Sequence, residues 1–328
     1  MRNLASSAIT LIIVLGVAIA GLAAWGERTF RGPGPLETEA VFEVPRGATL
    51  DRVAEKLEAE GVIASARVFR VGARLDGGAD RLRFGEFAIP ARASMEEVLD
   101  VLRSGRVILH FVTVPEGRTS HEAVAILNAS PVLTGEIEEI PPEGSLAPET
   151  FAVQRGDTRA SVIARMTEMQ RRILEEAWAA RNERSALRSP EEALILASII
   201  ERETAVRDEL ERVSAVFHNR LRRGMRLQSD PTIIYGLTRG EGPLGRALTR
   251  ADIESRTPWN TYVIDGLPPT PIANPGRAAI FAATQPIESD EYYFVADGTG
   301  GHAFARTLAE HNRNVAAWRA IERERASQ

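Results

Sequence analysis

The longest uncharged stretch of the chain lies near its start. Residues 4–25 are mostly apolar and carry no charge, with Arg2 before them and Glu27 as the next charged residue. These 22 residues match the roughly 20 that a helix needs to cross the hydrocarbon core of a membrane. A cleaved signal peptide is the alternative, since Ala18-Ile19-Ala20 fits a small-x-small cleavage site. The single preceding Arg2 and the length of the stretch favour an uncleaved anchor.

The N-terminal region therefore divides into three expected parts. We expect residues 1–3 to form a cytoplasmic stub, residues 4–25 a transmembrane anchor and residues 26–38 a tether. Gly32-Pro33-Gly34-Pro35 disfavours regular structure within the tether. Under either interpretation of the apolar stretch, everything after it lies outside the cytoplasm.

A strand-turn-helix pattern then recurs four times. Each copy opens with an apolar-x-apolar strand end and continues through a turn containing proline or glycine into an amphipathic helix. The copies are "FEVPRGATLDRVAEKL" from Phe42, "FAIPARASMEEVLDVL" from Phe87, "VTVPEGRTSHEAVAIL" from Val112 and "FAVQRGDTRASVIARM" from Phe151. Their unequal spacing excludes a fixed-period solenoid.

A hydroxyl side chain stands at one equivalent position in all four copies, where it can cap the first turn of the helix. These residues are Thr49, Ser94, Thr119 and Thr158. Glu97 and Glu122 complete capping boxes in the two middle copies. The first copy resembles LysM modules, which bind the N-acetylglucosamine chains of peptidoglycan and chitin. The alternative is that such units simply recur in α+β proteins.

The most apolar helix after the anchor ends in two acids. Ser189 and Pro190 predict its start as the N-cap and the first helical residue. Residues 193–200 are nearly all apolar, so the helix should be buried. Glu201 and Glu203 follow. Because residues two apart on a helix point in different directions, these acids cannot act as a close pair.

Helical spacing gives the two acids different surroundings. Glu203 shares a face with large aliphatic residues such as Leu196 and Ile200, whereas Glu201 lies on a smaller, partly polar face. A carboxyl held against aliphatic side chains loses solvation, so its pKa rises and it can act as a general acid near neutral pH. This argument selects Glu203. The alternative is a structural ion pair between Glu203 and Arg207, one turn later.

The sequence after these acids predicts a second helix and then a region rich in loops. The helix is expected over residues 208–223, with Leu210, Val213 and Phe217 on its core face, which puts Glu203 close to a helix junction where a cleft can open. The loops carry all four tyrosines, a tryptophan and several amide side chains. Such side chains suit a sugar-binding groove, although they are equally common as core residues.

Composition narrows the classes of function. The net charge is -5, which argues against a nucleic-acid partner. The absence of cysteine excludes disulfides, thiolate metal sites and a cysteine nucleophile. Lys56 is the single lysine and lies in an ordinary amphipathic pattern, so lysine Schiff-base catalysis is set aside. His302 and His311 lack the spacing of metal ligands, and we expect neither a metal nor an organic cofactor.

Several stretches together carry a family resemblance. They are "LILASIIERETAV", "VFHNRLRRGMRLQSDPTIIYG", "NTYVIDGLPPTPIANPG" and "YYFVADGTGGHAFARTLAEHN". They are similar to the YceG-like (MltG) family of endolytic murein transglycosylases. "EGSLAPETF" looks like a degraded form of the family's Glu-Gly-x-Leu-x-Pro-Asp-Thr-Tyr stretch, with Glu149 and Phe151 in place of Asp and Tyr. The resemblance implies an α+β protein with a LysM-like subdomain over residues 39–108 and a catalytic domain over residues 109–328.

The resemblance also implies a site and a reaction. The family's catalytic glutamate is the second acid of its Ile-Glu-x-Glu-Thr motif, which falls on Glu203. Glu203 would protonate the oxygen of the β-1,4 bond between N-acetylmuramic acid and N-acetylglucosamine, and the muramic C6 hydroxyl would attack to leave a 1,6-anhydro end. Because the substrate supplies the nucleophile, a second carboxylate is not required. The expected glycan-binding residues are Asn219, Gln228, Asp230, Thr232, Tyr235, Asn260 and Tyr262.

The resemblance further implies partners and a location. The substrate is the peptidoglycan glycan strand, the partners are peptidoglycan synthases (penicillin-binding proteins), and the role is termination of glycan elongation. The protein is placed in the bacterial inner membrane with its catalytic domain on the periplasmic side. Two rival hypotheses remain open. One is a hydrolase in which Glu203 and Asp230 form an acid and base pair, and the other is a non-catalytic glycan-binding scaffold.

Overall fold

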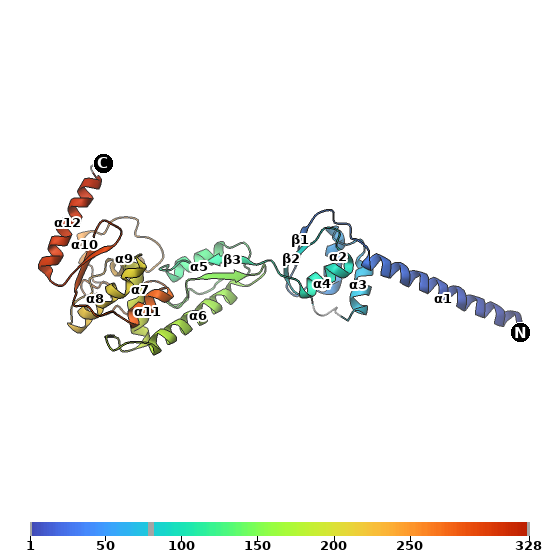
Figure 1. Ribbon diagram of the computed structural model, residues 1–328, viewed down its shortest axis with the longest axis horizontal. Helices are drawn as coiled ribbons and strands as arrows, with labels where there is room; N and C mark the ends of the chain where they lie inside the picture. The colour runs from blue at the N-terminus through green and yellow to red at the C-terminus, as the bar shows by residue number, and fades with distance from the viewer. Residues whose placement is uncertain (1, 78–81, 327–328) are drawn as a thin grey trace. The chain divides into compact units, whose positions relative to one another are not determined.

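The computed structural model describes residues 2–77 and 82–326 of the chain (Figure 1). The chain divides into two compact units. The first comprises Met1–His110 and Ala152–Asp157, and the second comprises Phe111–Phe151 and Thr158–Gln328. Both units contain helices and short strands, in agreement with the α+β class expected from the sequence.

The apolar N-terminal stretch forms part of one long helix, α1 (Arg2–Arg31). Its segment Ile9–Arg31 has a mean hydropathy of 2.3 and is long and apolar enough to cross a membrane. The helix runs beyond the expected anchor, so residues 26–31 of the expected tether are helical. The chain after the helix is also held, because the Gly34 amide donates a hydrogen bond to the Arg92 carbonyl at 3.0 Å.

The first two copies of the repeated pattern fold as predicted and pair with each other. Phe42 of the first copy lies opposite Phe87 of the second in an antiparallel strand pair. Thr49 and Ser94 cap the following helices, and Ser94 forms the full capping box with Glu97. The elements are β1 (Ala40–Val44), α2 (Leu50–Ala59), α3 (Ala66–Leu75), β2 (Gly85–Ile89) and α4 (Met95–Ser104). The LysM-like character of this region stays a prediction.

The apolar-x-apolar strand ends supply the core of the first unit. Phe42, Val44, Phe87 and Ile89 are at most 3% exposed. They belong to one cluster with the apolar faces of α2, α3 and α4. The recurring apolar positions of the sequence therefore indicate which face of each strand and helix is buried.

The third and fourth copies of the pattern also form strands that pair with each other. Thr119 forms the predicted capping box with Glu122, and Thr158 caps the last helix of the set. The elements are β3 (His110–Thr113), α5 (Ser120–Ala129), β4 (Thr150–Val153) and α6 (Arg159–Ala179).

Helix α7 (Pro190–Glu203) lies at the centre of the second unit, where it contacts α6, α8, α9 and α11 (Figure 1). Leu196, Ile199 and Ile200 of this helix are fully buried. The helix expected over residues 208–223 is divided, because the 3-10 turn η1 (Arg207–Glu209) precedes α8. The other elements are α8 (Leu210–Arg222), α9 (Asp230–Thr238), α10 (Arg250–Ile253), α11 (Arg277–Thr284), the antiparallel pair β5 (Tyr293–Ala296) and β6 (His302–Ala305), and α12 (Leu308–Ala326).

Candidate functional site

Helix α7 places the two candidate acids at its C-terminal end. The Ser189 hydroxyl accepts a hydrogen bond from the Glu192 amide at 3.3 Å, and Pro190 occupies the first turn, as the sequence predicts. The helix ends at Glu203, and Thr204 is extended. Glu203 is therefore the last helical residue, at the point where the chain leaves the hydrophobic core.

The Glu203 side chain is half-buried beside that core. Ile199 and Ile200, one turn earlier, are fully buried. Removal of water from the carboxyl raises the pKa of Glu203 to about 7. Near neutral pH a large share of the molecules therefore carries a proton on Glu203, which is the property required of a general acid.

Two residues that are adjacent in the sequence shift the pKa of Glu203 in opposite directions. The Ser229 hydroxyl lies beside the carboxyl and lowers its pKa, whereas the charge of Asp230 raises it. Ser229 is only 1% exposed, and within the described part of the chain its hydroxyl makes no hydrogen bond of normal geometry. A buried hydroxyl of this kind can donate to the carboxylate or to a bound substrate.

The buried guanidinium of Arg220, on α8, is a cationic neighbour of Glu203. Its Nε donates to the Tyr292 carbonyl and its Nη1 to the Leu227 carbonyl, both at 2.7 Å. Burial lowers the pKa of Arg220, and the nearby Glu203 acts in the opposite direction. The positive charge of Arg220 in turn lowers the pKa of Glu203. Arg220 therefore favours the carboxylate that forms once Glu203 has given up its proton.

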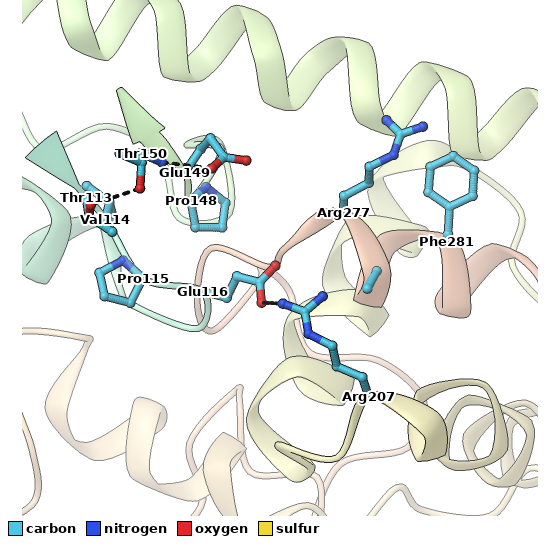
Figure 2. A pocket seen from close by; sticks show the side chains of 11 residues that line it. Thr113, Val114, Pro115, Glu116, Pro148, Glu149, Thr150, Arg207, Arg277 and Phe281 are labelled. Carbon is cyan, nitrogen blue, oxygen red and sulfur yellow. Dashed lines mark hydrogen bonds and ion pairs between the residues drawn. The ribbon is translucent and has the colours of Figure 1, made fainter. Parts of the chain in front are cut away.

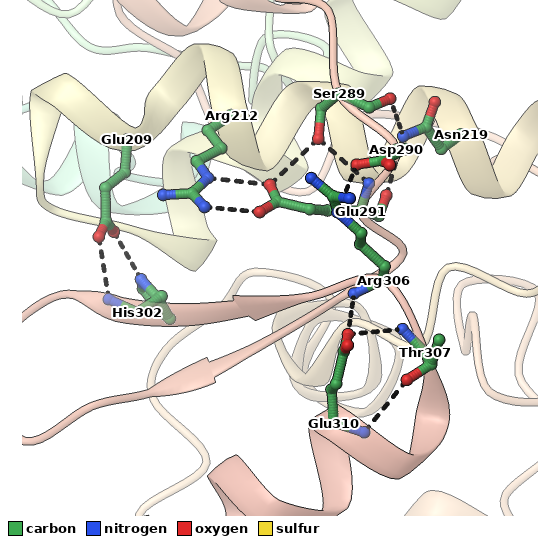
Figure 3. A network of polar contacts seen from close by, with 10 residues as sticks. All are labelled: Glu209, Arg212, Asn219, Ser289, Asp290, Glu291, His302, Arg306, Thr307 and Glu310. Carbon is green, nitrogen blue, oxygen red and sulfur yellow. Dashed lines mark hydrogen bonds and ion pairs between the residues drawn. The ribbon is translucent and has the colours of Figure 1, made fainter.

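His302, on β6, also lowers the pKa of Glu203. Glu209 holds this histidine twice: one carboxylate oxygen accepts from the His302 backbone amide at 2.9 Å, and the other lies 2.7 Å from Nδ1 (Figure 3). The imidazole ring packs edge-on against Phe294, with the centroids 5.4 Å apart. These contacts fix the orientation of the ring and direct Nδ1–H to Glu209.

Asn219, expected to bind substrate, lies in the neighbouring polar network (Figure 3). Its amide nitrogen donates to the carbonyls of Ser289 and Glu291, both at 2.8 Å, and its oxygen accepts from Arg222 at 2.6 Å. Arg212 binds the Glu291 carboxylate through two nitrogens. These contacts make Asn219 a support for the segment before β5, and its role in substrate binding stays a prediction.

Glu201 has different surroundings from Glu203. Its carboxylate accepts a hydrogen bond at 2.9 Å from the amide of Gly276, the residue before α11. Burial raises the pKa of Glu201, and the charge of Glu116 raises it further. Arg207 pairs with Glu116 at 2.8 Å (Figure 2). The alternative of an ion pair between Glu203 and Arg207 is therefore wrong. Helix α7 ends at Glu203, and Arg207 lies in the following 3-10 turn, where it pairs with Glu116.

A cavity of about 540 Å³ lies beside the pair of Arg207 and Glu116 (Figure 2). Arg277 and Phe281 of α11 also line it. Arg277 pairs with Glu176 at 2.5 Å. The predicted site residues do not line this cavity. It lies instead at the residues that surround Glu201.

The structure brings Asp230 and Tyr262 together near Glu203. The Tyr262 hydroxyl donates to Asp230 at 2.7 Å. Burial raises the pKa of Tyr262, and the charges of Asp230 and Glu203 contribute. Thr232 is fully buried, and its hydroxyl donates to the Ser229 carbonyl at 2.6 Å. Thr232 thus supports the turn that carries Ser229 and Asp230.

Tyr235, on the same helix as Asp230, lies against other residues of the second unit. Its ring is tilted against Trp259, with the centroids 5.8 Å apart. Burial raises the pKa of Tyr235 to about 12, with a contribution from Glu143. Glu143 belongs to the stretch that departs from the family pattern, and it accepts from the Ser120 amide at 2.8 Å. Tyr235 thus connects α9 to the start of α5.

The remaining two predicted residues contact loop backbone. Asn260 is fully buried and donates to the carbonyls of Ile253 and Ser255, at 2.9 and 2.7 Å. Gln228 has an exposed side chain and a positive φ of 51°, and its amide donates to the Thr261 carbonyl at 3.1 Å. Both residues hold the loops on either side of α9, and their contact with substrate stays a prediction.

Sequence reasoning missed four residues that surround Glu203 or its neighbours. They are Glu209, Arg220, Ser229 and His302. Three of them had an available signal, because Arg220 and Ser229 fall inside the quoted family stretch that begins at Val216, and His302 inside the one that begins at Tyr292. Within residues 2–77 and 82–326, no group of three acidic or histidine side chains could hold a metal ion.

The Glu203 carboxyl holds its proton near neutral pH and lies beside arginine, histidine and tyrosine side chains. This α+β protein therefore has the components of an acid-base enzyme. The sequence model of the YceG-like family matches residues 42–317. The chain therefore belongs to the YceG-like family, and the recognition from sequence motifs is confirmed.

Three relatives illustrate the likeness. An endolytic murein transglycosylase from Bacillus subtilis (strain 168) is 27% identical over 308 residues, which span 84% of this chain and 84% of that protein. One from Streptococcus pneumoniae serotype 2 is 26% identical over 321 residues, which span 83% of this chain and 57% of that protein. The 2.6 Å crystal structure of a yceG-like protein from Listeria monocytogenes aligns with a TM-score of 0.51 and 26% identity, covering 84% of this chain and 98% of that one.

Proposed function

We propose that the protein is an endolytic peptidoglycan lytic transglycosylase in which Glu203 is both the acid and the base. The observation that carries this proposal is the position of Glu203 at the end of α7, beside the buried Ile199 and Ile200, where burial raises its pKa to about 7. The names of the Bacillus and Streptococcus relatives support the reaction and the murein substrate. The contacts of the residues around Glu203 suggest which role each of them has in the reaction.

The proposed reaction has two proton transfers through one carboxyl. Protonated Glu203 donates to the oxygen of the β-1,4 bond as the bond from the anomeric carbon of N-acetylmuramic acid breaks. The resulting carboxylate then takes the proton of the C6 hydroxyl as that oxygen attacks the anomeric carbon. A 1,6-anhydro ring forms, and water is not consumed.

The polar neighbours favour the first step. Arg220, His302 and Ser229 each lower the pKa of Glu203, so they stabilise the carboxylate that the first transfer leaves. Burial works the other way: it keeps the proton on Glu203 before the first transfer, and it makes the carboxylate a stronger base in the second. A pKa near 7 is the balance of the two, and it allows the same group to donate and accept during one cycle.

We propose that the glycan strand lies over Glu203, Asp230 and Tyr262. Tyr262 offers an aromatic face beside the Asp230 carboxylate, the combination that sugar rings and their hydroxyls need. Tyr235 and Gln228 lie on the same segment around α9 and extend this surface, whereas Thr232, Asn219 and Asn260 hold its loops.

We further propose that α1 anchors the protein as a single span in the bacterial inner membrane, with both units on the periplasmic side. The length and hydropathy of the segment Ile9–Arg31 support this anchor, although a signal sequence can have the same length and hydropathy. An anchored enzyme of this kind would cut nascent strands beside the peptidoglycan synthases and end their elongation.

The test of the function uses the full-length protein, purified glycan strands and two matched variants. Glu203→Gln should reduce cleavage by at least about 10²-fold, while strand binding persists and the melting temperature does not fall. Glu201→Gln changes the same chemical group two residues away and should leave most of the activity. Full activity in Glu203→Gln would overturn the proposal. Binding with no cleavage in any form, wild type included, would favour the glycan-binding scaffold.

A further inference from the structure

A groove of about 650 Å³ in the first unit runs between the C-terminal end of α1 and the exposed face of α3. Its lining comes from α1 between Leu22 and Arg31 and from α3 between Arg67 and Leu75, together with Asp76 just after α3. We propose that this face of α3 rests in the lipid interface of the membrane, beside the point where α1 leaves the bilayer. This inference rests on the proposed role of α1 as a membrane anchor.

Close packing fixes the level of α3 along α1. The Phe30 ring lies over Gly72, where a Cβ atom would come within 2.3 Å of a ring carbon. Phe30 also packs against the core of the first unit. Arg31 pairs with Glu96 of α4 at 3.4 Å. The end of α1 is thus held to the unit at several points, so α3 cannot slide far along it.

The level of this contact coincides with the expected membrane boundary. Glu27 is the first charged residue after the apolar stretch, and Trp25 stands just before it with 60% of its surface exposed. Tryptophan is enriched at membrane interfaces. From Leu22 to Phe30 the helix rises about 12 Å, which covers the interfacial layer of roughly 5–8 Å and the edge of the hydrocarbon core.

The exposed face of α3 has the chemistry of an interfacial helix. Val71 is 52% exposed and Leu75 84% exposed, and both line the groove together with Leu22 and Trp25 of α1. Arg67 lies at the same groove and is exposed, where it can meet lipid phosphates. A lipid that surrounds the end of α1 also reaches Val71 and Leu75, because one groove contains side chains from both helices. Lipid is therefore the occupant that the groove fits best.

The chain contains no cysteine, so single labels test this contact in the full-length protein. Val71→Cys and Val41→Cys carry a polarity-sensitive fluorophore in nanodiscs of phosphatidylethanolamine and phosphatidylglycerol. Val41, on β1, is the matched control, since it is a valine of the same unit with 59% exposure and lies outside the groove. Quenching is measured with brominated acyl chains and with aqueous iodide.

We expect brominated lipid to reduce the emission at position 71 about twofold, as for a group 5–10 Å inside the interface, while iodide quenches position 41 more strongly. Equal iodide quenching at both positions would overturn the inference. Shielding of position 71 from both quenchers would also overturn it, because protein rather than lipid would cover the face. Failure of the Val41→Cys protein to remain with the nanodiscs would instead refute the anchor itself. Glycan cleavage by the same samples is a separate measurement of the proposed reaction.

Discussion

Glu209 holds His302 by two hydrogen bonds, one from the backbone amide at 2.9 Å and one with Nδ1 at 2.7 Å. The pair links the turn that follows α7 to strand β6. Because His302 lowers the pKa of Glu203, this pair contributes to the balance that leaves the carboxyl near 7.

The first prediction concerns that balance. His302→Gln removes a favourable charge interaction with the Glu203 carboxylate, so the pKa of Glu203 should rise. The alkaline limb of the kcat/KM profile against pH should then move to higher pH. Glu209→Gln should move it in the same direction, because the ring loses its support. His110→Gln, in the first unit, is the control, and a limb that stays in place in His302→Gln would count against this role.

Asp230 should have the opposite effect. Its negative charge raises the pKa of Glu203, so Asp230→Asn should move the alkaline limb to lower pH. Tyr262→Phe removes the 2.7 Å hydrogen bond but keeps the charge, and it should weaken glycan binding more than it moves the limb. If Asp230→Asn instead abolished turnover with no movement of the limb, Asp230 would be acting as a base, as the hydrolase hypothesis requires.

The two acids at the end of α7 should differ sharply in activity. Glu203→Gln removes the transferable proton and should reduce kcat by about 10²–10⁴-fold. Glu201→Gln keeps an oxygen that can accept from the Gly276 amide, so its loss should be less than about tenfold. Melting temperatures of the two variants show whether either loss comes from unfolding. Equal losses in two folded variants would contradict the assignment.

The raised pKa of Glu203 also predicts a cost in stability. Its pKa is about 7 in the folded protein against an ordinary value of 4.5, so between these pH values the folded state binds more protons than the unfolded one. The contribution of Glu203 to the free energy of unfolding is therefore fully present below pH 4.5, and it declines as the pH rises towards 7. Glu203→Gln avoids this loss and should be more stable than wild type at pH 8, by at most about 3 kcal/mol. Chemical denaturation at pH 4.5 and at pH 8 measures the difference, and an advantage that is equal at both values would contradict the linkage.

Local features of the fold were predictable from the sequence. The capping residues Thr49, Ser94, Thr119 and Thr158 all cap the helices expected of them, because a cap depends on the next three residues alone. The burial of α7 was equally clear from its apolar run, and it indicated why Glu203 could hold a proton.

Contacts between distant residues could not be predicted in this way. Glu209 and His302 are 93 positions apart, and nothing in either local sequence indicates the other. Arg207 was a plausible partner for Glu203 only if α7 continued beyond Glu203. The helix instead ends there, because Thr204 is extended, and Arg207 pairs with Glu116. Propensity does not determine such tertiary contacts.

The mass of the glycan ends tests the central claim most directly. Full-length protein is incubated with uncrosslinked glycan strands at pH 6 to 7, and the new ends are analysed by mass spectrometry, with Glu203→Gln as the control. If Glu203 directs the attack of the C6 hydroxyl, the new ends are 1,6-anhydro sugars, lighter by one water than hydrolytic ends, and they are absent from the control. Predominantly hydrated, reducing ends from the wild-type protein would contradict the account.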